Sequence, residues 1–435
     1  MLKAQDRSLW RVVFASVFVG GILAVNDVRS ISIDKGFSLA QPKWTFLVIT
    51  FFVIALLGGV LVFLVDKRRF ENLIIQFEET LSVGRKFSFF FFVFWGVSLF
   101  LLPSLELHPY LSSLVGGRFW IKFFIFALNA LVGASFLRMG SKKLSWGIGF
   151  AVAALAQLLV YRLVITSLYI TDYPFAIGWT RDSRYYYSSL FFSEKIYGQA
   201  TSLPILHPSL HFIFALPFLF KDMPLWVYRA WSVLLTIGLT FAVVFVLGRR
   251  FIFSASWKFS EQRARGFWGY VVWMFLFLLV GSVYAHLLIP TLIVLIFVSQ
   301  EKRWQSWVAI IVASLWAGVS RINWFPVPGM LAALLYFLEV PQGEKKLFNY
   351  LKIPALWFLV GTASAFLSQA VYIQASGNGV REEFYTSFSS DLLWYRLLPN
   401  ETYAPGILLG GLFLSLPIIV IVFRALRERF NRWKP

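Results

Sequence analysis

The residues best suited to chemistry gather in one polar stretch, Thr171–Leu210. It contains two aspartates, Asp172 and Asp182, whose carboxylates can accept protons, and two arginines, Arg181 and Arg184, which can bind anions. A tyrosine triplet and a His-Pro pair lie in the same stretch. Connections in compact chains usually have about 4–6 residues, so a polar loop of this length is typically functional. We interpret the stretch as one wall of an active site.

The composition indicates an all-α, polytopic membrane protein. Of the 435 residues, 59% are hydrophobic and only 14% are charged, and apolar runs long enough to span a bilayer recur throughout. Spanning segments must satisfy their own backbone groups, which favours helices. The absence of cysteine excludes disulfides and thiolate chemistry. The net charge of +19 fits basic loops facing anionic lipid better than it fits nucleic acid.

About twelve transmembrane helices are predicted. They lie near residues 10–25, 44–65, 87–103, 119–137, 145–169, 226–248, 266–283, 285–299, 305–319, 323–340, 350–373 and 405–424. Residues 1–144 form a four-span N-terminal extension, and residues 145–435 form a core with two large loops, 170–225 and 374–404. The apolar piece Leu210–Phe220 is too short to cross a bilayer and is predicted to lie in the interface.

The distribution of basic residues predicts the orientation. With both termini in the cytoplasm, 26 of the 40 Lys and Arg residues lie in inside loops and 13 lie outside. The polar stretch then faces the cell exterior or periplasm. Its middle part, Arg181–Gly198, is predicted to be an interfacial helix with Tyr186, Leu190 and Tyr197 on one side.

Four short motifs follow one another in a recognisable order. They are Asp182-Ser-Arg-Tyr-Tyr-Tyr, His207-Pro-Ser-Leu-His, Tyr228-Arg-Ala-Trp and a span closing on Gly248-Arg-Arg-Phe. This order resembles the GT-C superfamily of integral membrane glycosyltransferases, especially its protein mannosyltransferase and aminoarabinose transferase branch, over about residues 145–340. The chain departs from that pattern at Ser183, where the family often has Glu, and in its four preceding spans.

The resemblance implies an enzyme that transfers a sugar from a polyprenyl-phosphate donor to a lipid, glycan or protein acceptor on the outer face, with inversion. Asp182 matches the family's catalytic aspartate, which would act as general base. The alternative for Asp182 is a charge that only stabilises a helix N-terminus. Asp172 is the second candidate, either assisting the base or holding a divalent metal such as Mg²⁺ or Mn²⁺ with Asp182. Two carboxylates are few ligands for such a hard cation.

A lipid-phosphate leaving group calls for arginine near the outer interface. The candidates are Arg184, Arg229, Arg321 and Arg396. Arg321 lies at the junction of two apolar spans, where a charge is costly and therefore indicates a function, although snorkelling would also explain it.

Other substrate-binding candidates are Tyr185, His207 and His286. His207 would orient donor or acceptor, whereas His286 would contact substrate or only cap a turn. In the late loop, Trp394 and Tyr395 are suited either to stacking on a sugar or to anchoring at the interface.

Two other classes of protein remain open. A transporter or flippase would also have many spans, but we find no internal repeat and few midplane charges. An oligosaccharide polymerase or ligase would need a similar outer loop and arginines for a lipid pyrophosphate. No P-loop, dinucleotide fingerprint or zinc motif is present in the sequence.

Overall fold

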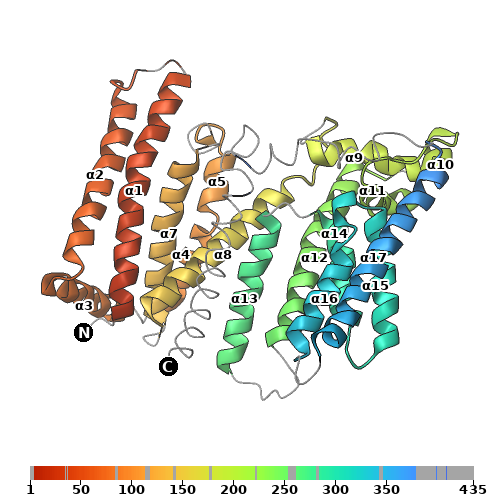
Figure 1. Cartoon of the computed structure of the whole chain (residues 1–435). Helices are drawn as coiled ribbons and strands as arrows, with labels where there is room; N and C mark the ends of the chain where they lie inside the picture. Colours follow the sequence, from red (N-terminus) through yellow and green to blue (C-terminus); the bar gives the residue numbers. More distant parts are fainter. Residues whose placement is uncertain are drawn as a thin grey trace. The chain divides into compact units, whose positions relative to one another are not determined.

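The computed structural model describes residues 4–34, 36, 38–83, 87–112, 118–140, 144–175, 179–220, 223–252, 261–280, 284–341, 346–378, 398 and 408. All secondary structure within these residues is helical (Figure 1). Within the described residues, eight helical segments are long and apolar enough to cross a membrane, which confirms a multi-span helical membrane protein. Two of these segments, Phe89–Leu107 and Ile322–Glu339, each consist of two consecutive helices. The predicted count of twelve is not confirmed, and the last predicted span, 405–424, lies outside the described residues.

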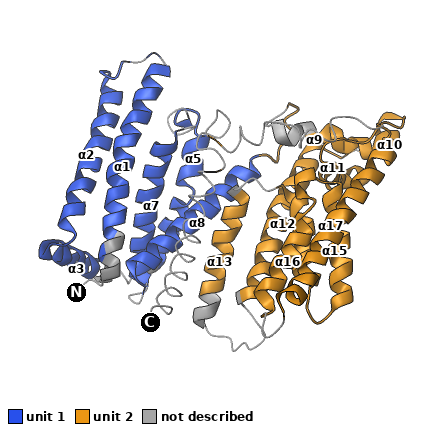
Figure 2. Cartoon of the chain, in the orientation of Figure 1, with its two compact units in different colours: residues 1–168 blue, residues 169–435 orange. Residues whose placement is uncertain are grey.

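The chain forms two compact units, residues 1–168 and 169–435 (Figure 2). The span α8 (Trp146–Ser167), which the sequence assigned to the core, packs against α7 (Phe119–Gly140) in the first unit. Packing and function need not divide a chain at the same residue, so the predicted functional boundary after residue 144 stays a prediction.

The first unit contains a surface helix among its long apolar ones. Besides α7 and α8 its described helices are α1 (Ala4–Asp34), α2 (Pro42–Leu64), α3 (Arg68–Val83), α4 (Ser88–Ser98) and α5 (Leu101–Leu107). α3 is amphipathic: Phe70 and Ile74 are buried against Trp10 and Trp146, whereas Glu78 pairs with Arg138. The face of α3 that carries Phe70, Ile74 and Glu78 therefore packs on the spans.

The second unit combines short helices with long ones. In chain order its described helices are α9 (Trp179–Ser189), η2 (Leu190–Phe192), α10 (Ser193–Tyr197), α11 (Pro208–Ala215), η3 (Leu216–Leu219), α12 (Leu225–Ile252), α13 (Glu261–Val280), α14 (Ala285–Phe297), α15 (Arg303–Gly318), η4 (Ile322–Trp324), α16 (Val327–Glu339) and α17 (Leu347–Ala375). α14 has 13 residues, fewer than the roughly 20 that a bilayer requires. The apolar run that predicts a span at 285–299 therefore corresponds to a helix that is shorter than the bilayer.

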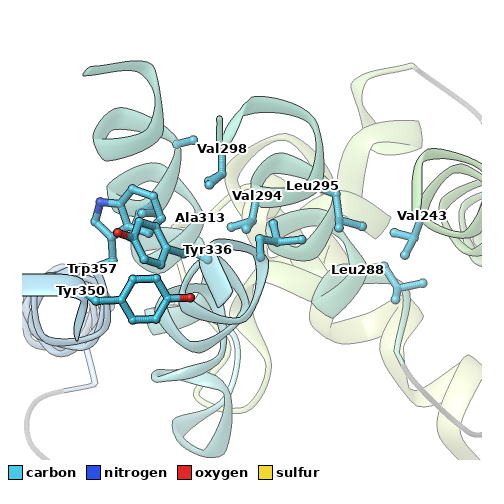
Figure 3. Close-up of a cluster of buried hydrophobic side chains, with 13 residues drawn as sticks. Val243, Leu288, Val294, Leu295, Val298, Ala313, Tyr336, Tyr350 and Trp357 are labelled. Atoms are coloured by element: carbon cyan, nitrogen blue, oxygen red, sulfur yellow. The ribbon is translucent and has the colours of Figure 1, made fainter. Parts of the chain in front are cut away.

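An aromatic core holds α14 to α17 together. Tyr336 and Trp357 meet edge to face with ring centroids 5.9 Å apart, in a buried cluster that also contains Val294 and Leu295 (Figure 3). Gly318 of α15 is required by close approach, because a Cβ there would lie 2.2 Å from the carbonyl oxygen of Ala365 in α17. The helix packing is therefore tight where α15 crosses α17.

Arg250 fastens one end of this bundle. It donates to the carbonyl oxygens of Leu295 (2.6 Å) and Val298 (2.7 Å) at the end of α14, and to the Glu339 carboxylate (2.8 Å) at the end of α16. These bonds satisfy C-terminal carbonyls that have no partner within their own helix. We call this group the Arg250 cluster. It joins the C-terminal ends of α12, α14 and α16.

The polar stretch folds into short helices rather than one. A 3₁₀ turn, η2, separates α9 from α10, which ends at Gly198 in the left-handed conformation (φ 73°). Leu190 is buried whereas Tyr186 and Tyr197 are exposed, so the prediction that these three residues share one side of a helix is wrong. The turn at η2 changes the direction in which successive side chains point.

Candidate functional site

The candidate site lies where three segments of the second unit meet. The first turn of α11 is joined to the end of α15 by a hydrogen bond from the Ser209 amide to the Val319 carbonyl oxygen (3.0 Å). The hydroxyls of Ser209 and Ser320 are 2.6 Å apart. The start of α14 reaches the same place, since the Trp316 indole donates to the His286 carbonyl oxygen (2.9 Å). Residues predicted separately are thereby brought together.

Two arginines share one aromatic ring at this junction. The guanidinium carbon of Arg184, from α9, lies 4.9 Å from the Tyr284 ring centroid, and that of Arg321 lies 5.7 Å from it. Both guanidinium carbons therefore lie within 6 Å of the same point, the centre of the Tyr284 ring. Burial lowers the pKa of Arg184, and the charge of Arg321 lowers it further. Cation–π contacts contribute about 0.5–2 kcal/mol each, which offsets part of the repulsion.

Three histidines line the same cluster. The rings of His207 and His286 lie 5.6 Å apart, and the His207 ring is 5.5 Å from that of Tyr284. His211 stands one turn further along α11 against Tyr187, at 5.3 Å. Among the described residues, Nδ1 of each histidine and Nε2 of His286 are buried without a hydrogen-bond partner. Buried polar atoms of this kind usually mark a place where a ligand or water belongs.

His207 also has an unusual backbone. Its φ and ψ of 53° and 50° place it in the left-handed region, and it is the only described residue other than glycine with a positive φ. Pro208 follows and begins α11, which disfavours a right-handed helical conformation at His207. Strain of this kind persists where the surroundings hold it and is concentrated at functional sites.

The electrostatics favour an anion. Burial first, and then the charges of Arg321 and Arg184, lower the pKa of His207 to about 3. Burial and Arg184 lower the pKa of His211 to about 4. Both imidazoles are therefore neutral near pH 7, beside two guanidinium groups that stay charged. This set of groups suits a phosphate or carboxylate ligand.

These pKa shifts predict a loss of stability in acid. The unfolded histidines bind protons near pH 6.5 whereas the folded ones do not, so unfolding takes up protons and stability falls as the pH drops from about 6.5 towards 4. We expect each histidine to cost roughly 2 kcal/mol between pH 7 and pH 5. Melting temperatures of the wild type and of a His207→Gln, His211→Gln double variant would test this. An equal loss in both proteins would contradict it.

The described residues do not form a metal site. No group of three or more His, Asp or Glu side chains among them is placed to hold a metal ion, and the two arginines repel cations. The side chain of Asp182 lies outside the described residues, so the suggested Mg²⁺ or Mn²⁺ site at Asp172 and Asp182 stays a prediction.

Asp172 has a structural role that the sequence did not indicate. Its Oδ1 accepts a hydrogen bond from the backbone amide of Trp226 (3.0 Å) in the first turn of α12. A carboxylate there satisfies a free N–H and interacts favourably with the helix dipole. The geometry therefore favours a role for Asp172 in capping α12.

Capping predicts how Asp172 variants behave. Asp172→Ala should lower stability by about 1 kcal/mol, whereas Asp172→Asn, which retains an oxygen acceptor, should stay near the wild type. Thermal unfolding of the two variants measures the difference. A loss of activity larger than about 100-fold in Asp172→Asn at normal stability would instead assign Asp172 to catalysis.

Arg229, predicted to bind phosphate, anchors the polar stretch. It is only 3% exposed and donates to the carbonyl oxygens of Thr171 (2.8 Å), Tyr173 (2.9 Å) and Phe175 (3.2 Å). These bonds occupy the guanidinium group with backbone, so the geometry favours loop anchoring over substrate binding for Arg229.

Tyr185 is a packing residue in this structure. Its ring meets those of Phe218 and Tyr228 edge to face, each at 5.0 Å. Burial raises its pKa, which keeps the hydroxyl protonated. The remaining predicted residue, Arg396, lies outside the described residues, as do Trp394 and Tyr395.

Sequence reasoning missed two members of the cluster, Tyr284 and His211. His211 follows His207 by four residues, which is one helical turn, and Tyr284 precedes His286 by two residues. Both spacings can be read from the sequence, but neither shows which residues these side chains contact.

Comparisons of the chain with family models, curated proteins and solved structures find no match. The functional inference therefore rests on the residues and their geometry.

Proposed function

We propose that the protein is a membrane glycosyltransferase of the GT-C type, which moves a sugar from a polyprenyl-phosphate donor to an acceptor hydroxyl. The observation that supports this most directly is the pair Arg184 and Arg321, which share the Tyr284 ring beside neutral histidines. Two guanidinium groups at one end of an apolar helical bundle suit the phosphate of a lipid-linked substrate.

The reaction divides between two groups of residues. The acceptor oxygen attacks the anomeric carbon, the bond from that carbon to the phosphate oxygen breaks, and the acceptor proton passes to the Asp182 carboxylate. The electron pair stays on the departing phosphate, which Arg184 and Arg321 stabilise. A general base of this kind contributes about 10²–10⁴-fold. The role of Asp182 follows from the sequence resemblance.

The proposed setting is the plasma membrane, with twelve spans, both termini in the cytoplasm and the site facing outward. The excess of basic residues in the predicted inside loops supports this orientation. Because the chain has no cysteine, a single cysteine at Ser202 can be labelled alone. Labelling only from the cytoplasmic side would overturn the orientation.

One experiment separates the enzyme from the alternatives. Purified protein is incubated with a set of radiolabelled polyprenyl-phosphate sugars and a mixed membrane extract as acceptor. Transfer or slow hydrolysis of the donor supports the proposal. Turnover of only pyrophosphate-linked oligosaccharides would favour a polymerase or ligase, and movement of intact donor across vesicles would favour a flippase.

A further inference from the structure

We infer that Tyr284 is the positioning residue of this site, because its ring sets the spacing of the Arg184 and Arg321 guanidinium groups for one phosphate. The choice of phosphate as ligand rests on the proposed function. The spacing rests on the geometry alone. The two arginines come from separate segments, before α10 and after α15, and Tyr284 comes from a third, at the start of α14.

Two like charges need a reason to stay close. Both guanidinium groups lie within 6 Å of the centre of the Tyr284 ring, at 4.9 Å and 5.7 Å. The negative face of an aromatic ring attracts cations, so one ring can hold both groups against their repulsion. Loss of the ring would remove the contact that the two guanidinium groups share, and their spacing around a single phosphate would then change.

The ring is itself held in place. Tyr284 is the N-cap of α14, and its carbonyl oxygen accepts the Leu287 amide (3.0 Å). The His286 side chain two residues later is fully buried, and its ring lies 5.8 Å from that of Tyr284. The His207 ring flanks Tyr284 at 5.5 Å. A side chain fixed by its neighbours is what a positioning role requires.

The inference predicts a graded series of binding affinities. The probe is a short-chain polyprenyl phosphate in detergent micelles, with the uncharged polyprenol as reference. Tyr284→Phe keeps the ring and should bind within about 3-fold of the wild type, whereas Tyr284→Leu should bind about 10-fold more weakly or worse. Tyr186→Leu, at an exposed ring on α9, is the matched control and should bind as the wild type does.

A double-mutant cycle separates positioning from general loss of structure. Removing Arg321 should weaken binding by about 10-fold or more in the wild type but by less than about 3-fold in Tyr284→Leu, because the second arginine is already misplaced. Equal effects in both backgrounds would overturn the inference. So would wild-type affinity in Tyr284→Leu, or absence of phosphate-dependent binding in the wild type.

The two proposals fail in different ways. Phosphate-dependent binding that follows the predicted series, in a protein that transfers no sugar from any donor, would end the glycosyltransferase proposal and leave the role of Tyr284 intact. Sugar transfer with an affinity series that ignores Tyr284 would do the reverse. The melting temperature of each variant checks folding, and Tyr284→Phe should restore what Tyr284→Leu loses.

Discussion

Arg184→Ala and Arg321→Ala are each expected to weaken donor binding by roughly 10- to 100-fold. Hydrogen bonds to charged groups contribute about 1.5–3 kcal/mol, and both guanidinium groups lie within 6 Å of the Tyr284 ring centroid. The Lys variants should recover only part of the loss, because an ammonium group cannot bind two phosphate oxygens side by side. Donor affinity and the KM of transfer measure the effect.

An arginine elsewhere in the second unit provides the control. Arg303, exposed at the start of α15, lies at the other end of that helix from Ser320 and should be replaceable by Ala without effect. If Arg184→Ala and Arg321→Ala bound donor as tightly as Arg303→Ala does, the cluster would not be the phosphate site.

Asp182→Asn is expected to reduce transfer by about 10²–10⁴-fold while leaving insertion, folding and donor binding intact. Asparagine has nearly the same shape but cannot take a proton from the acceptor hydroxyl. The prediction rests on the sequence, since the backbone of Asp182 belongs to α9 but its side chain lies outside the described residues. Turnover at saturating donor is the measurement.

Asp172→Asn is the matched control for this second prediction. It removes the same charge from the same polar stretch, but at a residue that caps α12. Normal turnover in Asp172→Asn together with loss in Asp182→Asn would assign the base. Near-normal turnover in Asp182→Asn would remove the mechanism as written.

The alternation of spans explains what the sequence could predict. Successive spans cross in opposite directions, so the sequence predicts His207, His286 and Arg321 all at outer ends. The structure brings these three to one junction, with Arg184 beside them. The length of each apolar run predicts where a span ends, and the alternation of spans then predicts which ends lie on the same side of the bundle.

Lateral packing explains what the sequence could not predict. An arginine near an interface has the same sequence signature whether its partner is a phosphate or, as for Arg229, three loop carbonyls. An exposed aspartate likewise looks the same as a base or as the cap that Asp172 provides. Tyr284 matters only because two distant segments reach its ring. Such roles depend on which helices are neighbours, and spacing along the chain does not contain that information.

The Arg250 cluster affects how precisely the opposite end of α12 is positioned. That helix has 28 residues and is therefore about 42 Å long. A tilt of about 3° at its fastened end would displace the far end by about 2 Å. The far end carries Tyr228, which packs on Tyr185 of α9, the helix that also holds Arg184. Misplacement of about 1 Å can cost 100-fold in rate. The alignment of Arg184 and its neighbours therefore depends partly on a guanidinium group a whole helix length away.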